Sequence, residues 1–275
     1  RIGIFPMFFD KDGELYTYTA YGDFPMILPR RKVSSPEELF PGWMLLSYNK
    51  PVTVSSELDA YPKEYAVDED VRTYWSASTG EKGEWIIVDL EKECIVNAVQ
   101  INYAENNTTI TGRNSDIYCQ YDLEYSLDKK EWETIKSRKS SKKDLPHDYI
   151  ELKKPVKARY IKLTNRHVPD GTFALSGLRV FGSAKGKLPK EVERLSIVRS
   201  DTDRCVVKLN WPKSAGATGY TIRYGSQKDK LYHFYQVFDS SIVIGSLNRF
   251  ENYFFSIDAF NENGITKGTK IVNID

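Results

Sequence analysis

Short apolar runs separated by turn residues recur along the whole chain. Residues 85–90 form a continuous apolar run, and residues 121–125 alternate apolar with polar side chains. Runs of this length and period are typical of β-strands, and no segment shows a convincing helical stripe. The pattern therefore predicts an all-β fold built from sandwiches or barrels rather than an α/β fold.

The first 32 residues predict a β-hairpin. Two apolar runs, residues 4–9 and 15–19, flank the turn sequence of residues 10–13. A two-stranded hairpin is marginally stable alone. Its apolar faces therefore imply either a missing partner or docking on the next domain.

Proline-rich and glycine-rich stretches divide the chain. We expect terminal strands and a linker over residues 1–46, a first domain over 47–183, a linker over 184–189 and a second domain over 190–275. The last segment holds about seven short apolar runs, a spacing that fits an antiparallel sandwich of the immunoglobulin type.

Charge and hydropathy narrow the classes of partner. The chain has 39 basic and 38 acidic residues, a balance that offers no field to attract nucleic acid. The basic run of residues 136–143 lacks interleaved aromatic side chains and is interpreted as a solvated loop. No apolar stretch is long enough to span a membrane, and no signal peptide is present, so we expect a fragment or a processed product.

The middle segment resembles the discoidin family, also called coagulation factor type C domains or family 32 carbohydrate-binding modules. Five stretches carry this resemblance together and in order: residues 66–75, 84–90, 125–132, 159–163 and 178–182. The resemblance implies a jelly-roll β-sandwich with ligand-binding loops at one end.

The last segment resembles a fibronectin type III domain. Trp211 stands where that family has its core tryptophan, and Leu247 and Tyr253 have the spacing of its tyrosine corner. In such a corner the tyrosine hydroxyl binds upstream backbone. The resemblance implies an immunoglobulin-like sandwich that acts as a spacer.

The first residues look like the closing strands of a family 43 glycoside hydrolase, on residues 1–12 and 18–25. Those enzymes are five-bladed propellers whose catalytic carboxylates come from earlier blades. This resemblance implies an accessory region of a secreted, periplasmic or cell-surface polysaccharide-degrading enzyme, such as a β-xylosidase or arabinofuranosidase. The partners would be an oligo- or polysaccharide and an upstream catalytic domain. The alternative is that both modules only brace that domain and bind no glycan.

The segment offers no catalytic residues of its own. A glycosidase needs two carboxyl groups across the scissile bond, and no motif nominates such a pair. Histidines 147, 167 and 233 have no assignable nucleophile partner. We therefore expect no enzymatic activity from this segment alone.

Candidate glycan-binding residues are polar or aromatic side chains on loops, where binding residues concentrate. They are Tyr61, Tyr65, His147, Arg166, His167 and Phe173. Residues 165–173 offer the guanidinium of Arg166, the imidazole of His167 and the aromatic ring of Phe173, a combination that suits a sugar ligand. The alternative for Phe173 is that its ring fills the bottom of the sandwich.

A calcium site is the one metal site considered. Asp68, Asp70 and Thr73 match the stretch where discoidin modules often hold a structural calcium. Many relatives complete that site with a glutamate, whereas this chain has Gly177. Because calcium favours several anionic oxygens, we expect weak calcium binding or none, and no other cofactor. The alternative is that Asp68 and Thr73 bind local backbone groups of a tight loop.

Tryptophans and cysteines are assigned to the interior. Trp75, Trp85 and Trp132 lie in strand-like sequence, so core packing is expected over sugar stacking. Cys94 and Cys119 could pair, although buried thiols are the favoured interpretation.

Overall fold

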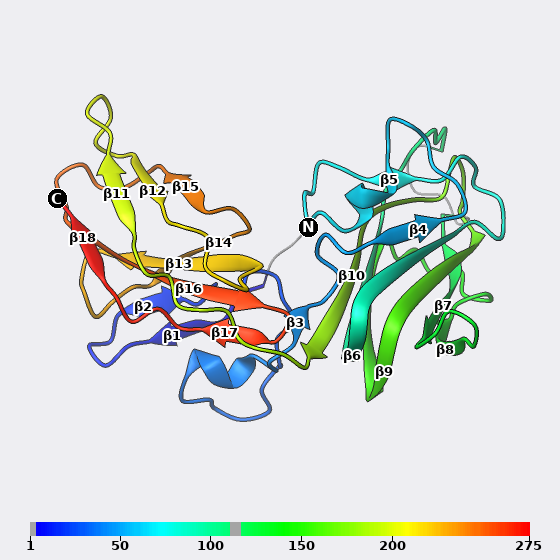
Figure 1. Cartoon of the computed structure of the whole chain (residues 1–275), viewed down its shortest axis with the longest axis horizontal. Coiled ribbons are helices and arrows are strands. Elements are labelled where there is room, and N and C mark those ends of the chain that lie inside the picture. The colour runs from blue at the N-terminus through cyan, green and yellow to red at the C-terminus, as the bar shows by residue number, and fades with distance from the viewer. Residues whose placement is uncertain (1–3, 111–116) are drawn as a thin grey trace. The chain divides into compact units, whose positions relative to one another are not determined.

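The computed structural model describes residues 4–110 and 117–275. The described residues form strands joined by loops and two short 3-10 helices, so the predicted all-β class is confirmed (Figure 1). The chain divides into two compact units. One comprises residues 45–184, and the other combines residues 1–44 with residues 185–275.

The unit of residues 45–184 is a sandwich whose strands follow the order β3-β10-β6-β9-β7-β8, with β4 on β6 and β5 on β10. Its elements are β3 (Met44–Leu45), β4 (Val52–Val54), η2 (Lys63–Ala66), β5 (Trp75–Ser76), β6 (Trp85–Tyr103), β7 (Gln120–Ser126), β8 (Glu133–Ser137), β9 (His147–His167) and β10 (Ala174–Ala184). The pairing of β6 with β9 breaks between Asp89 and Cys94. Residues from both sides of that break, such as Val88 and Val99, enter one core.

The alternation along β6 decides which side chains reach that core. Ile86, Val88 and Leu90 are buried against it, while Trp85 and Asp89 lie on the other face and stay partly exposed. The prediction that Trp85 is a buried core residue is therefore wrong. A continuous apolar run suggested burial on both faces, but the face that carries Trp85 is covered only in part: Ile87 on that face is buried, whereas Trp85 is not.

The other unit contains a second sandwich. Its three-stranded sheet has the order β11-β12-β15 and its five-stranded sheet the order β14-β13-β16-β17, with β18 on β16. These strands are β11 (Ser196–Arg199), β12 (Val207–Asn210), β13 (Gly219–Gly225), β14 (His233–Val237), β15 (Ser241–Ile244), β16 (Tyr253–Asn261), β17 (Gly264–Thr266) and β18 (Val272–Ile274). Trp211 and Phe255 are buried between the sheets. The Tyr253 hydroxyl accepts a hydrogen bond from the Asn248 N–H at 3.0 Å, which is the backbone contact predicted for a tyrosine corner.

The N-terminal segment packs on the outer face of this five-stranded sheet. The segment comprises β1 (Met7–Phe9), β2 (Leu15–Thr17) and η1 (Pro36–Leu39). The Tyr16 ring stacks on Tyr232, with 4.1 Å between centroids, and Tyr18 packs on Phe234 at 4.9 Å. The hairpin therefore docks on the last sandwich, with which it forms one compact unit.

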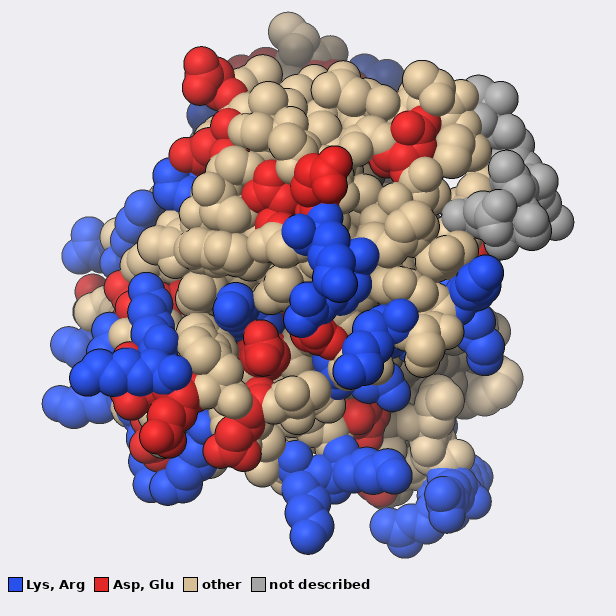
Figure 2. Space-filling view, turned by 90° about the vertical axis from the view of Figure 1, so that its right-hand side faces the viewer, with Lys and Arg blue, Asp and Glu red and all other residues tan. Residues whose placement is uncertain are grey.

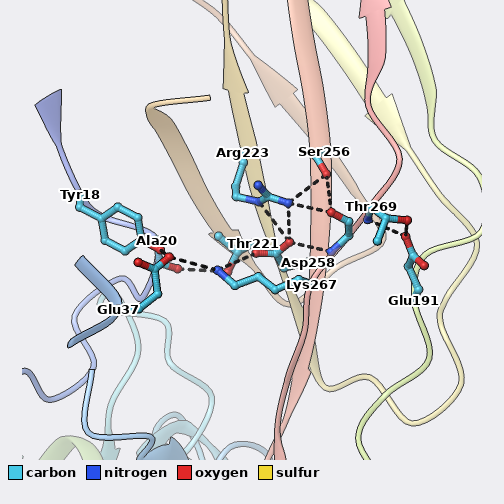
Figure 3. A network of polar contacts seen from close by, with 11 residues as sticks. Tyr18, Ala20, Glu37, Glu191, Thr221, Arg223, Ser256, Asp258, Lys267 and Thr269 are labelled. Carbon is cyan, nitrogen blue, oxygen red and sulfur yellow. Dashed lines mark hydrogen bonds and ion pairs between the residues drawn. The ribbon is translucent and has the colours of Figure 1, made fainter. Parts of the chain in front are cut away.

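Polar contacts hold the same segment. The Thr221 hydroxyl donates to the Ala20 carbonyl at 3.1 Å, and Lys267 lies 3.9 Å from Glu37 (Figure 3). Asp258 anchors this network: its carboxylate is almost fully buried and pairs with Arg223 at 2.9 Å. At the hairpin turn, the Lys230 ammonium contacts the carboxylates of Asp10, Asp12 and Glu14 at 2.8–3.1 Å. The predicted hairpin turn is thus also one side of an ion-pair cluster.

Candidate functional site

Three loops of the 45–184 unit meet at one end of its sandwich, at the top of the unit in Figure 1. A buried polar cluster joins them. The Asn106 Nδ2 donates to Ser76 Oγ at 3.1 Å and to Thr172 Oγ1 at 3.0 Å, and its Oδ1 accepts from the Tyr74 hydroxyl at 3.2 Å. Since buried amide and hydroxyl groups bind each other here, the loops have defined positions relative to one another. We call this end the loop end.

A second link comes from the end of β9. The Asn165 side-chain amide donates to the carbonyls of Gly80 and Glu81 at 2.9 and 3.0 Å. The Asp170 carboxylate accepts from the backbone N–H of Thr109 and from its hydroxyl. These N–H donors stabilise the ionised form and lower the pKa of Asp170 to about 2. The loop of residues 168–173 is therefore fixed on both sides.

Arg166 and His167, two of the predicted residues, lie together at the loop end. The His167 ring packs on Tyr118 with 4.5 Å between centroids, and both side chains are partly exposed. Arg166 forms an ion pair with Asp122 and keeps about a third of its side chain exposed. Burial of Asp122 acts to raise its pKa, but the contacts with Ser137, Arg166 and Lys139 outweigh it, and the pKa is lowered. We call Tyr118 and His167 the ring pair.

The prediction missed Tyr118. This residue follows the polar insertion of residues 106–116, which suggested only a long loop. Its aromatic side chain one residue before Cys119 and two before β7 was the available signal. Residues 111–116 of that insertion lie outside the described residues.

Tyr61 also lies at the loop end, apart from the ring pair. Its ring stacks on Tyr74 with 4.4 Å between centroids, and burial together with the Tyr61 contact raises the pKa of Tyr74 to about 12. Tyr65 is partly buried in η2, and His147 is exposed at the start of β9 with its Nδ1 3.0 Å from Asn102 Oδ1. None of the recorded contacts joins these three residues to the ring pair.

Phe173 is not available to a ligand. Its side chain is 0% exposed and packs edge-to-face on Trp75, with 5.3 Å between centroids. The prediction of an aromatic sugar platform at Phe173 is therefore wrong, and the alternative, a ring that fills the sandwich, is correct. Trp75 is likewise buried as predicted, whereas Trp132 is only partly buried.

The residues considered for calcium bind one another and the local backbone. The Thr73 hydroxyl donates to Asp68 Oδ2 at 2.7 Å, and the Asp70 N–H donates to Asp68 Oδ1 at 2.9 Å. The Asp70 carboxylate is engaged by Arg72. Within the described parts of the chain, no group of three or more His, Cys, Asp or Glu side chains could hold a metal ion.

A buried arginine supports this loop instead. Arg179 is 2% exposed and donates to both carboxylate oxygens of Glu69, at 3.0 and 2.9 Å, and to Gln100 Oε1 at 2.9 Å. Glu69 adopts a φ of 64°, a conformation that non-glycine residues rarely take. The guanidinium thus fixes the loop of residues 68–73 on β10. Sequence reasoning considered Gly177 but missed Arg179, two residues further along the same strand.

The three cysteines are thiols and not disulfide-bonded among the described residues: Cys94 is buried, and burial raises the pKa of Cys119 to about 12. In the portion of the chain that is described, no helix has the length and apolar character needed to cross a membrane.

One protein-family model matches this unit. Residues 51–176 match the family model described as F5/8 type C domain, which confirms the predicted discoidin resemblance for this part of the chain. No match was found among curated protein sequences.

Solved structures similar to the chain include two carbohydrate-binding modules. Chitosan-binding module 1 of a chitosanase/glucanase from Paenibacillus sp. IK-5 is 23% identical, over 50% of this chain and 99% of that one, with a TM-score of 0.43. The family 32 module of Clostridium perfringens NanJ, solved with galactose, is 17% identical over 50% and 98% of the two chains, with a TM-score of 0.41.

Proposed function

We propose that the F5/8 type C domain binds a glycan at its loop end. The observation that carries this proposal is the ring pair: Tyr118 and His167 lie in contact and partly exposed, beside Arg166, where the loops converge. Ligand sites combine an apolar or aromatic surface with a few oriented polar groups, and this arrangement has both.

The residue types suit a sugar. The face of an aromatic ring can pack against the C–H groups of a pyranose, while imidazole and guanidinium nitrogens bind its hydroxyl groups. The fixed neighbours matter too, because Asn165 and Asp170 order the chain on each side of Arg166 and His167. A site ordered before binding loses less entropy when the sugar binds.

We further propose that the chain is an accessory region of a secreted, periplasmic or cell-surface polysaccharide-degrading enzyme of the family 43 type, with no glycosidase activity of its own. The N-terminal hairpin supports a contact with an upstream catalytic domain. Its inner face packs on the last sandwich, whereas Met7, Phe9 and Leu15 on its outer face are 58%, 73% and 53% exposed. Contiguous exposed apolar side chains often mark protein interfaces.

A second candidate function is bracing without glycan binding. One observation favours it: residues 7–40 already pack on the sandwich of residues 185–275, so part of this chain serves to hold another part. Under this proposal, the fibronectin type III-like sandwich supports an upstream domain and is not a flexible spacer.

Calorimetric titration of the whole chain with a glycan panel separates the two candidates. The panel comprises galactose, chitotriose, xylo-oligosaccharides and arabino-oligosaccharides. We expect saturable binding by at least one glycan and its loss in Tyr118→Ala. Tyr235→Ala is the matched control, because Tyr235 is similarly exposed, at 43%, but lies on β14 of the other unit. Absence of binding across the panel, with the fold intact, would favour bracing.

A further inference from the structure

Positive charge is concentrated beside the ring pair. Residues 136–143 contain five basic side chains and no acidic one, although the whole chain carries a net charge of only +1. Lys139 and Lys142 in this segment are exposed. The face shown in Figure 2 carries many Lys and Arg side chains, with Asp and Glu side chains among them. A neutral chain with a basic patch at its candidate site suggests that the patch contributes to recognition.

The basic segment is held against the beginning of β7. The Arg138 N–H donates to the Tyr121 carbonyl at 2.8 Å, and the Gln120 side-chain amide donates to the Ser141 carbonyl at 3.0 Å. These bonds place the Lys142 Nζ 5.8 Å from the centroid of the Tyr118 ring. The lysine and the ring pair therefore belong to one surface.

Two of the nearby cations are already neutralised, and two are not. Arg138 pairs with Asp148, and Arg166 pairs with Asp122. Among the residues that the structure describes, no acidic side chain lies within ion-pair distance of Lys139 or Lys142. Lys139 is nevertheless close enough to Asp122 to lower its pKa, after the stronger effects of burial, Ser137 and Arg166. Asp144 follows the segment and acts on Cys119, but the four lysines of residues 136–143 outnumber it, so the surface beside the ring pair keeps a net positive charge.

We infer that the glycan bound at the loop end is anionic and carries carboxylate or sulfate groups. This inference rests on the proposed function. The sugar ring packs on the ring pair, while Lys142 and Lys139 attract the acidic substituents of the same or the next residue. Lysine is a strongly hydrated point charge without the planar fork of arginine, so it suits carboxylate and sulfate alike.

The test compares glycans that differ only in charge. Oligogalacturonates and their methyl esters have the same sugar skeleton, and the ester is neutral. Titrated into the whole chain at about 10 mM salt, the free acid should bind about tenfold more tightly than the ester, and the gap should shrink at about 150 mM salt because exposed charges are screened. A sulfated galacto-oligosaccharide beside its desulfated form tests the sulfate source in the same way.

Variants locate the effect. Lys139→Gln/Lys142→Gln should weaken binding of the free acid by about five- to tenfold and leave binding of the ester unchanged. Lys153→Gln/Lys154→Gln removes the same charge from exposed positions on β9 far along the strand from His167, and should change the affinity less than about twofold.

The outcomes are distinguishable. Equal binding of acid and ester, or an equal loss in both double variants, overturns the anionic specificity while the proposed glycan binding stands. Binding of a single-stranded DNA of matched charge as tight as that of the best glycan would show a general polyanion surface and also overturn the inference. If no glycan binds at any salt concentration, the proposed function fails, and the inference fails with it.

Discussion

The two sandwiches of this chain bury polar side chains in different places. In the 45–184 unit, Ser76, Asn106 and Thr172 are buried at the loop end and join loops to one another. In the other unit, Thr221 and Asp258 are buried on the outer face of a sheet and contact or support an N-terminal segment distant in sequence. Because buried polar groups need partners, these clusters show what each fold must hold in place. One fold holds loops at a candidate site, and the other holds a piece of its own chain.

Truncating the Phe173 side chain should cause the largest loss of stability among the changes that test this comparison. Phe173→Ala should cost about 3–5 kcal/mol in the free energy of unfolding, since a fully buried ring is removed beside Trp75. Trp85→Ala should cost clearly less, because Trp85 is only partly buried. Denaturant unfolding of both variants measures the difference. Equal losses would show that the outer face of β6 is covered after all.

Removing Arg179 should have the next largest effect. Arg179→Met leaves the largely buried Glu69 carboxylate without its partner, which costs about 3 kcal/mol. Arg179→Met/Glu69→Gln should recover part of that loss.

Calcium should not stabilise this loop. The melting temperature of the parent chain should be the same with calcium and with chelator, whereas calcium bound at 100 times its dissociation constant would add about 2.7 kcal/mol of stability. A clear stabilisation by calcium would contradict the view that Arg179 and the hydrogen bonds of Asp68 fix this loop without a metal ion.

The hydrogen bond of the tyrosine corner in the last sandwich should contribute less to the free energy of unfolding. Tyr253→Phe removes the hydroxyl that accepts from the Asn248 N–H and should cost about 1 kcal/mol, the usual net value of one hydrogen bond. Tyr235→Phe, on a tyrosine that is 43% exposed on β14, is the matched control. The unfolding of the 45–184 unit should be unaffected by either change. A loss shared by both units would contradict their independence.

Acid should have the smallest and most local effect: it should increase local opening of the N-terminal hairpin. Burial acts to raise the pKa of Asp10, but the N–H groups of Glu14 and Asp12 and the Lys230 ammonium lower it from 3.8 to about 2. A lowered pKa means that Asp10 contributes stability above pH 3.8, and that this contribution is lost as the pH falls towards 2.

The stabilising contribution of Lys230 depends on pH only in the alkaline range, because its pKa is raised. Contact with Asp12 is the largest cause that raises its pKa, so its contribution is complete below its ordinary value of 10.5 and is lost only in strong base. Hydrogen exchange of residues 5–18, corrected for intrinsic rates, should therefore be flat from about pH 5 to 9 and rise below about pH 4. Lys230→Met should raise that exchange at every pH; unchanged protection would show that the stacked tyrosines suffice.

Local patterns predicted most of the fold and part of the site. The apolar runs gave the all-β class, and the spacing of Leu247 and Tyr253 predicted the backbone contact now seen at Asn248. Arg166 and His167 were found because loop residues with donors and rings suit a ligand. Phe173 belongs to the same polar stretch, yet its ring turns inward beside the first residue of β10. Side-chain direction at the end of a loop is decided by tertiary packing, which sequence period does not report.

The remaining features depend on contacts between distant residues. Glu69 and Arg179 are 110 residues apart, and Ala20 and Thr221 are 201 apart. No window of sequence contains both partners, so neither contact could be predicted from patterning. Lys142 was assigned to a solvated loop for the same reason, since its neighbour Tyr118 comes from another loop.

The N-terminal segment and the last sandwich form one unit although residues 45–184 separate them in sequence. During synthesis, residues 7–40 are made before their sheet and cannot pack on it until β13, β14 and β16 have been made. The intervening domain has its own core and can fold in the meantime. Until then Tyr16 lacks its stacking partner Tyr232, so a ribosome-bound chain that ends at residue 190 exposes both faces of its hairpin to chaperones or to aggregation.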